Sequence, residues 1–313
     1  MHMKILITGG AGFIGSHLVD KFIRMKSEVI VLDNLSTGNI EFIQEHLNKP
    51  NFKFYKVDLL DRIEDYFRDV DEVWHLAANP NVRIIDPKIH FEQNILATKS
   101  VLEAMRKNDV KKIFFTSSST VYGEAISSIK SVPIKEDSPT NPISLYGASK
   151  LASEALIQAY CHVYDFQAWI FRLANIVGPR LTHGVIFDFI NKLRKNPNKL
   201  EILGDGNQKK SYLFIEDCIR GMMILRRKGK ERVNIFNIGN EDWISVKSIA
   251  KIICKKLNLR PKFKFTGGDR GWKGDVPLMI LDISKAKKFG FKPKYDSEKA
   301  VIKAVKGMIK NEK

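Results

Sequence analysis

A tyrosine and a lysine four positions apart are the residues of this sequence best suited to proton transfer. The segment Tyr146-Gly147-Ala148-Ser149-Lys150 puts a phenol and an ammonium group one helical turn apart, on one face of an expected helix. Because a nearby cation stabilises a phenolate, the pair predicts a Tyr146 pKa lowered from about 10 toward neutrality. Tyr146 can then act as a general base that removes a hydroxyl proton.

A run of hydroxyl side chains supplies the second part of this chemistry. Residues 116–123 read Thr-Ser-Ser-Ser-Thr-Val-Tyr-Gly and follow an expected strand. We expect the Ser118 hydroxyl to hydrogen-bond the same substrate oxygen as Tyr146, and Lys150 also to hold the ribose of a redox cofactor. Tyr146, Lys150 and Ser118 are therefore the predicted catalytic residues of a hydride transfer between a substrate and that cofactor.

Three glycines near the amino end form a second motif. Gly9, Gly12 and Gly15 lie in a segment that follows one expected strand and opens an expected helix. Such glycines allow a tight turn, let the backbone approach a pyrophosphate, and place the phosphates at the helix amino terminus. A glycine triplet alone would suit any strand-to-helix turn, but in this context it predicts a dinucleotide site.

Asp33 predicts which dinucleotide is bound. It ends the second expected strand, where a carboxylate can bind both ribose hydroxyls of the adenosine and would repel a 2′-phosphate. We therefore expect NAD⁺ rather than NADP⁺, although Asp33 could instead only cap a turn. Further cofactor contacts are expected from the glycine segment, the strand ends and one helix: Phe13, Ile14, Asn34, Ser36, Gly38, Asp58, Leu59, Leu76, Ala77, Ala78, Asn94 and Ser117.

The elements that must position these residues alternate along the first half of the chain. Short β-branched runs predict strands, and longer stretches with apolar residues at helical spacing predict crossover helices. This alternation predicts an α/β fold, a Rossmann-type doubly wound parallel sheet with helices on both faces. The expected strands are 4–8, 28–33, 52–57, 72–76, 112–117 and 168–173, and the expected helices are 14–25, 90–107 and 149–164.

After Asn175 the pattern changes to shorter pieces punctuated by Pro and Gly, with one further expected strand at 233–238. We expect residues 1–175 to form the NAD-binding domain, which also borrows about 211–240. Residues 176–313 are expected to form mainly a smaller, interleaved domain for the substrate.

Composition narrows the possible functions. The chain has 313 residues, 44% hydrophobic content and a formal net charge of +17. The lysines are spread along the sequence, which favours solvated helix faces over a nucleic-acid interface. The electrostatic field of the net positive charge would still attract dianionic ligands. We expect a soluble, cytoplasmic protein with no membrane or nucleic-acid partner. The three cysteines are far apart and no histidine cluster is evident, so no disulfide framework and no metal are expected.

Taken together, these motifs resemble the extended short-chain dehydrogenase/reductases, specifically the NAD-dependent epimerase/dehydratase family. The resemblance covers nearly the whole chain and is closest to archaeal-type UDP-glucose 4-epimerases, notably in residues 118–123, 175–180, 183–186 and 271–276. It implies that Tyr146 deprotonates the sugar 4-hydroxyl while C4 gives hydride to tightly held NAD⁺. The 4-keto sugar then turns over and takes the hydride back on its other face, an activity of galactose metabolism.

The resemblance also implies a substrate site and an oligomeric state. Asn175 matches a position near the substrate phosphates, and Val185 and Ile186 match the segment around the uracil. Lys210 stands where many relatives have a diphosphate-binding arginine. Trp272 replaces another arginine common in epimerases, so Arg270 or Lys273 is expected to contact the phosphate instead. A homodimer formed through helices 90–107 and 149–164 is expected.

Related activities are separated by few residues. Sugar-nucleotide 4,6-dehydratases resemble this chain but carry an Asp-Glu pair where Ser119 and Thr120 stand, so elimination is disfavoured. The glutamate typical of UDP-glucuronate decarboxylases at position 120 is also missing. Epimerases of UDP-N-acetylglucosamine or UDP-glucuronate stay open as alternatives, as does a dinucleotide-binding protein without catalysis.

Overall fold

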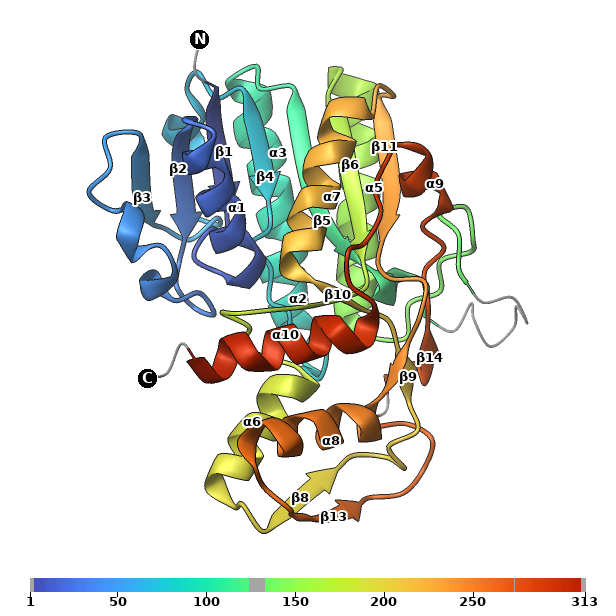
Figure 1. The fold of residues 1–313 in the computed structure, drawn as a ribbon. Coiled ribbons are helices and arrows are strands. Elements are labelled where there is room, and N and C mark those ends of the chain that lie inside the picture. The colour runs from blue at the N-terminus through green and yellow to red at the C-terminus, as the bar shows by residue number, and fades with distance from the viewer. Residues whose placement is uncertain (1–2, 124–132, 273, 311–313) are drawn as a thin grey trace. The chain divides into compact units, whose positions relative to one another are not determined.

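A seven-stranded sheet organises the amino-terminal part of the chain (Figure 1). The computed structural model describes residues 3–123, 133–272 and 274–310. The strands of the sheet are β1 (Lys4–Thr8), β2 (Glu28–Asp33), β3 (Phe52–Lys56), β4 (Glu72–His75), β5 (Lys112–Ser118), β6 (Gln167–Leu173) and β11 (Val233–Ile238). Their order is β11-β6-β5-β4-β1-β2-β3, and the pairs β1–β2, β2–β3, β1–β4 and β4–β5 are parallel.

All seven strands occur where the β-branched and aromatic runs predict them, with ends that agree to within one residue. The predicted Rossmann-type α/β fold is confirmed. The strand order also locates the predicted site. The chain continues from β1 to β2 on one side of β1, and later forms β4 on the opposite side of β1. Ligands of such sheets bind at the carboxyl ends of the strands beside this reversal, and Thr8 is the last residue of β1.

Helices cover both faces of this sheet (Figure 1). One face is covered by α1 (Phe13–Arg24) and the end of α7 (Ile215–Lys228), the other by α3 (Ala97–Lys107) and α5 (Leu145–Tyr164). The predicted helix 149–164 begins earlier because Ser144 caps it: the Ser144 Oγ accepts a hydrogen bond from the Gly147 amide at 3.1 Å. The predicted helix 90–107 is interrupted, since α2 (Pro87–His90) and a π-helical stretch (Phe91–Leu96) precede α3.

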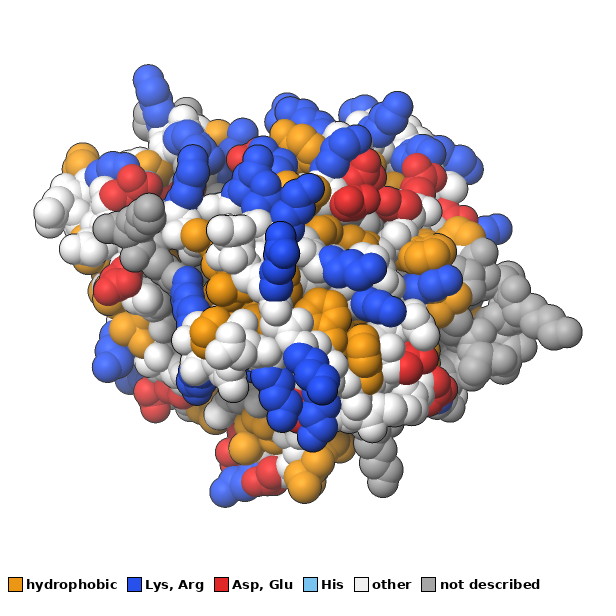
Figure 2. All heavy atoms as spheres, turned by 60° about the horizontal axis from the view of Figure 1, so that its bottom comes forward, with side chains coloured by type: hydrophobic (Ala, Val, Ile, Leu, Met, Phe, Trp, Pro, Cys, Tyr) orange, Lys and Arg blue, Asp and Glu red, His pale blue; other side chains and the backbone are white. Residues whose placement is uncertain are grey.

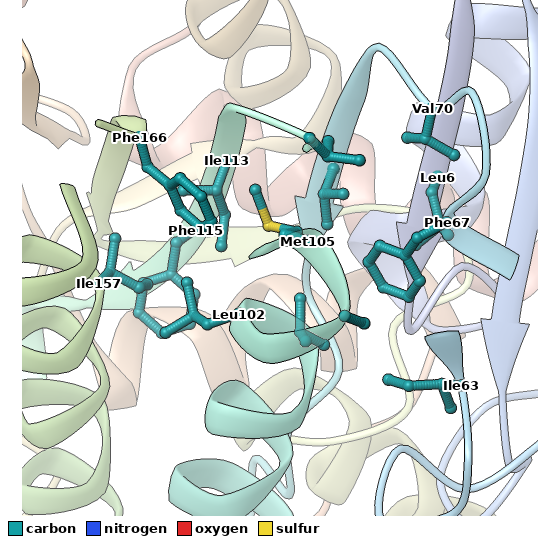
Figure 3. Packing of buried hydrophobic residues seen from close by; sticks show 14 of the residues in the cluster. Leu6, Ile63, Phe67, Val70, Leu102, Met105, Ile113, Phe115, Ile157 and Phe166 are labelled. Atoms are coloured by element: carbon teal, nitrogen blue, oxygen red, sulfur yellow. The ribbon is translucent and has the colours of Figure 1, made fainter. Parts of the chain in front are cut away.

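Each face of the sheet has its own apolar core. Beneath α3 and α5, Leu102, Met105 and Ile157 pack against Ile113 and Phe115 of β5 (Figure 3). On the opposite face an aromatic series runs from α1 across the sheet: the ring centroids of Phe22 and Trp74 are 5.3 Å apart, those of Trp74 and Phe114 4.4 Å, and those of Phe114 and Trp169 4.5 Å. These two cores fix the strands whose carboxyl ends carry the predicted site.

The chain divides into two compact units. The first comprises 1–121, 142–172 and 222–236, and the second comprises 122–141, 173–221 and 237–313. The chain returns to the first unit only over residues 222–236, and residues 122–141 lie in the second unit. The domain bounds 1–175 and 176–313, with about 211–240 borrowed, stay predictions. The assignment of the cofactor to one unit and the substrate to the other stays a prediction.

The second unit is built from short elements around small sheets. Its pairs are β7 with β10 and β8 with β13, both parallel, and β9 with β12 and β14. The bounds are β7 Asn175–Val177, α6 Val185–Lys195, β8 Lys199–Ile202, β9 Lys209–Lys210, β10 Tyr212–Phe214, β12 Ile244–Ser245, α8 Val246–Leu257, β13 Lys262–Phe265, β14 Leu278–Met279, α9 Ser284–Lys288 and α10 Ser297–Lys310.

The positive charge is distributed over the surface. Figure 2 shows lysine and arginine side chains scattered over one face, with acidic and hydrophobic side chains between them. This distribution agrees with solvated helix faces. Within the described residues, no helix combines the length and apolarity that a membrane crossing requires.

Candidate active site

The glycine segment between β1 and α1 forms a close-packed turn. Gly9 has a φ of +71°, and its amide donates to the Leu32 carbonyl at 2.8 Å. A Cβ on Gly15 would lie 2.1 Å from the Gly9 carbonyl oxygen, so only glycine lets α1 start this close to the turn. Gly12 is the N-cap of α1 and makes no side-chain cap, and the first turn holds no acidic residue. The first amides of α1 are thus left for an anionic group.

Asp33 lies at the carboxyl end of β2 beside this turn. Its Oδ2 accepts from the Ala11 amide at 3.0 Å and its Oδ1 from the Leu35 amide at 2.8 Å. The residue is 8% exposed, and burial raises the pKa of its carboxyl while the two amides oppose the rise. Gly38 closes the pocket, because a Cβ there would lie 2.9 Å from Asp33 Oδ1. Asp33 is therefore joined to the glycine turn, and its contact with the ribose stays a prediction.

The other predicted cofactor residues lie around the same strand ends. Asn34 donates its side-chain amide to Asp58 Oδ2 at 2.8 Å, which links the ends of β2 and β3. Ala77 follows β4 and passes so close to the glycine turn that a Gly9 Cβ would lie 2.6 Å from its amide nitrogen. Phe13 and Leu59 are buried, Ser36 is exposed, and Ile14, Leu76 and Ala78 are partly exposed.

Tyr146 and Ser118 are brought together by a close approach of α5 to the end of β5. Gly147 makes the approach possible, since a Cβ on it would lie 2.6 Å from the Thr120 carbonyl oxygen. The Tyr146 hydroxyl hydrogen-bonds Ser118. The Ser118 Oγ accepts from the Thr120 hydroxyl at 2.9 Å, so its own proton is free to point at the phenol oxygen.

The predicted lowering of the Tyr146 pKa is wrong for the protein alone. Burial raises the pKa of Tyr146 to about 12, and the hydrogen bond with Ser118 only opposes this rise. The Lys150 Nζ lies 5.9 Å from the Tyr146 ring centroid and donates to the Thr116 carbonyl at 2.9 Å. Lys150 is itself buried, and burial lowers its pKa to about 7. Lys150 is buried and Tyr146 is partly exposed, and in each of them the loss of contact with water disfavours the charged form.

Asn94 and His75 belong to a buried polar network behind the catalytic helix. The Asn94 amide donates to the Ser149 Oγ at 2.8 Å, and its Oδ1 accepts from the Asn79 amide at 2.7 Å. His75 lies between Thr8 at 2.7 Å and Thr98 at 3.0 Å. These contacts of Asn94 tie α5 to the segment after β4, and its contact with the cofactor stays a prediction.

The second unit holds the residues predicted for the substrate. Asn175 begins β7 and donates its side-chain amide to the Ser211 carbonyl at 3.1 Å. Val185 and Ile186 open α6 after Gly184, whose φ is +85°. Val185 is partly exposed, but the Ile186 side chain is packed inside the unit at 1% exposure. At Ile186 only the backbone is therefore placed to meet a ligand.

Lys210 and Arg270 are gathered around one buried carboxylate in the second unit. The Lys210 Nζ forms a short ion pair with Asp275 Oδ1. The Arg270 Nη1 donates to the Asp275 carbonyl at 3.3 Å. Trp272 covers Gly274, where a Cβ would lie 2.3 Å from the indole ring, so this tryptophan packs within the loop. Lys273 lies outside the described residues.

A buried ion pair next to the catalytic residues was not predicted from the sequence. Glu154, one helical turn after Lys150, binds Arg172 of β6 with an Nη2–Oε2 distance of 2.7 Å. The signal available in the sequence was an acidic residue on the same face of α5 as Tyr146 and Lys150. The second signal was Arg172, a charged residue inside the predicted strand 168–173.

One group of possible metal ligands occurs within the described residues. The ligand atoms of Asp20, Glu45 and His46 lie within 4.8 Å of one another. Both ring nitrogens of His46 are engaged, however, with Asp20 at 2.7 Å and with the Lys49 ammonium at 2.8 Å. A neighbouring ammonium opposes a metal cation, so we assign this group to local packing.

The first unit suits NAD on two independent observations. A glycine cradle that side chains would fill adjoins the uncapped start of α1, and a buried carboxylate stands at the end of β2. The cradle and helix start suit a pyrophosphate, and the carboxylate suits ribose hydroxyls without a 2′-phosphate.

Comparison with known proteins agrees with this geometry. Residues 5–239 match the model of the NAD dependent epimerase/dehydratase family. A putative UDP-glucose 4-epimerase of Methanocaldococcus jannaschii is 38% identical over 98% of this chain and 99% of its own. A dTDP-D-glucose 4,6-dehydratase of Dictyostelium discoideum is 39% identical over 80% of this chain and 61% of its own.

Solved structures match over nearly the full length. A crystal structure of a UDP-galactose 4-epimerase is 40% identical, covers 99% of both chains and has a TM-score of 0.87. A UDP-glucuronic acid 4-epimerase of Bacillus cereus, in complex with UDP-glucuronic acid and NAD, is 29% identical, covers 99% of this chain and 100% of its own, and has a TM-score of 0.89. The chain therefore belongs to the NAD-dependent epimerase/dehydratase family of extended short-chain dehydrogenases/reductases, whose members act on nucleotide sugars.

Proposed function

We propose that this protein is a UDP-glucose 4-epimerase, which interconverts UDP-galactose and UDP-glucose through a 4-keto sugar. The observation that carries the proposal is the arrangement of Tyr146, Ser118 and Lys150 at the carboxyl end of β5. It provides one proton-transfer group and one hydroxyl for a single substrate oxygen. The similarity to 4-epimerases over nearly the whole chain supports the same reaction.

Each residue has a separate part in this reaction. Tyr146 takes the proton of the sugar 4-hydroxyl, and Ser118 donates a hydrogen bond that steadies the phenolate. Lys150 supplies a positive charge close to the phenol. Because burial alone holds the Tyr146 pKa near 12, the phenolate needs this charge to form at neutral pH. NAD, when bound, takes up and returns the hydride of C4 and adds the positive charge of its oxidised nicotinamide ring.

The end of β5 distinguishes epimerisation from elimination. A 4,6-dehydratase must also move a proton from C5 and expel the 6-hydroxyl, which requires a further acid and base. Ser119 and Thr120 stand where 4,6-dehydratases carry the Asp-Glu pair, and neither hydroxyl titrates near neutral pH. Because neither hydroxyl serves as an acid or base, Tyr146 is the proton-transfer group at this strand end. One such group is sufficient for epimerisation.

The substrate proposal rests on the second unit. Lys210 and Arg270 supply the positive charge for the diphosphate, and Asn175 and the start of α6 would contact the nucleotide. UDP-N-acetylglucosamine and UDP-glucuronate are the alternative substrates, and similarity to 4-epimerases of both sugars supports keeping them. We further propose that the protein is a cytoplasmic homodimer that pairs through α3 and α5 and acts in galactose metabolism.

The catalytic assignment is tested by Tyr146→Phe, with Tyr160→Phe as the matched control. Tyr160 lies on the same helix and donates its hydroxyl to Glu103 at 2.6 Å, away from Ser118. We expect Tyr146→Phe to lower kcat by about 10²-fold to 10⁴-fold at unchanged NAD content, and Tyr160→Phe to keep turnover. Wild-type turnover of Tyr146→Phe would refute the assignment, and light scattering that gives a monomer mass would refute the dimer.

A further inference from the structure

A buried ion pair lies directly behind the Tyr146–Lys150 pair. Glu154 follows Lys150 by one turn of α5 and is fully buried, and the Arg172 side chain on β6 is 6% exposed. The guanidinium Nη2 lies 2.7 Å from Glu154 Oε2, and the Nε contacts both carboxylate oxygens at 3.1 and 3.2 Å. Such a fork of hydrogen bonds fixes the carboxylate in position and direction.

The same carboxylate anchors the strand that carries the catalytic serine. The Ser117 Oγ donates a short hydrogen bond to Glu154 Oε1. Ser117 stands between Thr116, whose carbonyl accepts from Lys150, and Ser118, which hydrogen-bonds Tyr146. One carboxylate thus joins α5, β5 and β6 at the level of the catalytic residues.

Few charged or titratable groups face Lys150 within the described residues. Tyr146 and Glu154 face it from its own helix, His75 from β4, and the Phe115 ring lies 4.7 Å away on β5. Arg172 of β6 lies behind Glu154. Burial, together with the charge of Lys150, lowers the pKa of His75 to about 3, so His75 is neutral at pH 7. Glu154 is therefore the negative group among those that face Lys150 at this pH.

Stability alone does not account for a buried pair of this kind. Replacing a buried ion pair by apolar residues of similar volume is often neutral or stabilising, because desolvation offsets the attraction. Removing one partner, in contrast, leaves an uncompensated buried charge, which is strongly destabilising. The position of Glu154, one turn from Lys150 and bonded to the neighbour of Ser118, points to a role in the active site.

We propose that Glu154 and Arg172 are positioning residues, which hold Ser117 and α5 in register and place a carboxylate that favours the ammonium form of Lys150 beside Tyr146. Burial opposes the charge of Lys150, and the Glu154 carboxylate opposes that effect of burial. Arg172 holds the Glu154 carboxylate in place, and its positive charge weakens the effect of that carboxylate on Lys150. The consequence for turnover rests on the proposed function, but the effect on Lys150 does not.

The direct test is the ionisation of Lys150 in the full-length protein. Nζ-¹⁵N lysine spectra are recorded over a pH series without substrate, and the Lys150 signal is assigned with Lys150→Arg. The variants are Glu154→Gln, which removes the charge and little volume, and Glu154→Gln/Arg172→Met, which removes both charges. Glu72→Gln is the matched control, because Glu72 pairs with Arg226 at 2.7 and 2.9 Å in an equally buried fork at the start of β4, away from Lys150.

The proposal predicts an order of Lys150 pKa values. Glu154→Gln lowers the pKa by about 1–3, because the Arg172 and Lys150 cations then face each other across a neutral amide. The double variant lies between Glu154→Gln and wild type, and Glu72→Gln equals wild type. If Glu154→Gln does not fold, the double variant still has to give a lower Lys150 pKa than wild type. An unchanged pKa in both variants, or an equal fall in Glu72→Gln, would overturn the proposal.

Kinetics provide the second readout. At saturating UDP-galactose, we expect the alkaline fall of kcat in Glu154→Gln to move to lower pH by as much as the Lys150 pKa, with KM unchanged. A uniform loss of kcat at every pH, with the spectra of wild type, would indicate a purely structural role and overturn the proposal. If no variant and no wild-type protein turns over UDP-sugars, the proposed function fails while the titration still decides the role of Glu154.

Discussion

Gly15→Ala tests the geometry of the predicted NAD turn most sharply. The added Cβ would lie 2.1 Å from the Gly9 carbonyl oxygen and 2.8 Å from the Gly10 Cα, and both contacts are with backbone. Because no side chain can rotate away, the turn or the start of α1 must move by about 1 Å. Overpacking of this kind costs about 1–3 kcal/mol, which for a chain of 313 residues corresponds to a fall in Tm of roughly 1.5–4.5 °C.

Gly12→Ala is the matched comparison. Its Cβ would lie 3.2 Å from the same carbonyl oxygen, so the protein alone can accept it with a shift of a few tenths of an ångström. At the N-cap of α1, however, the methyl group occupies the space where the pyrophosphate is expected. We expect Gly15→Ala to lower both Tm and NAD affinity, and Gly12→Ala to weaken NAD binding at least about tenfold with little change in Tm.

The assay combines a thermal melt of the NAD-free protein with calorimetric titration of NAD⁺. A wild-type Tm and NAD affinity in Gly15→Ala would refute the close approach of α1 to the turn. Wild-type NAD affinity in Gly12→Ala would refute the placement of the pyrophosphate at the start of α1.

Four further predictions concern residues at the same strand ends. Asp33→Ser should raise the affinity for NADP⁺ relative to NAD⁺ by about tenfold or more, since a like charge is removed, and equal ratios in both proteins would contradict the role of Asp33. Because burial raises the pKa of Asp33, wild-type NAD affinity should fall on acidification at a higher pH than an exposed aspartate would give, and Asp33→Ser should lack this fall. Gly38→Ala, whose Cβ would lie 2.9 Å from Asp33 Oδ1, should weaken NAD⁺ binding in calorimetry without changing the NADP⁺ ratio as Asp33→Ser does. The pKa of His75 is about 3 in the folded protein against 6.5 in the unfolded chain, so between pH 3 and 6.5 the unfolded chain binds more protons. The free energy of unfolding therefore falls by about 1.4 kcal/mol for each pH unit of acidification. Denaturant titrations should show a weaker pH dependence of this free energy for His75→Gln, and an unchanged pH dependence would contradict the buried neutral histidine.

Local patterns in the sequence were sufficient for the sheet and for the proximity of Tyr146 to Lys150. Strands such as β1 and β2 are continuous apolar runs, and a parallel sheet with both faces covered requires this. The Tyr146–Lys150 pair depends only on the period of a helix. Both are properties of a few neighbouring residues.

The features that the sequence did not predict depend on residues that are distant in the chain and close in the fold. The Tyr146 pKa rises because burial outweighs the hydrogen bond with Ser118, and the Lys150 ammonium is turned toward the Thr116 carbonyl. Neither burial nor the direction of the ammonium can be read from spacing. The Glu154–Arg172 pair joins a helix to a strand eighteen residues later, and Asn34 meets Asp58 across two strand ends. Such pairs follow from the order of strands in the sheet, which no local pattern contains.

The most direct test of the central claim is product analysis after incubation of the purified protein with UDP-galactose, and separately with UDP-N-acetylgalactosamine, UDP-galacturonate and dTDP-glucose. We predict that UDP-galactose is converted to UDP-glucose without added reductant, and that Tyr146→Phe slows the conversion by about 10²-fold to 10⁴-fold. Preference for one of the other two UDP-sugars would keep the 4-epimerase reaction and change its substrate. A 4-keto-6-deoxy product from dTDP-glucose, or no conversion of any sugar, would contradict it.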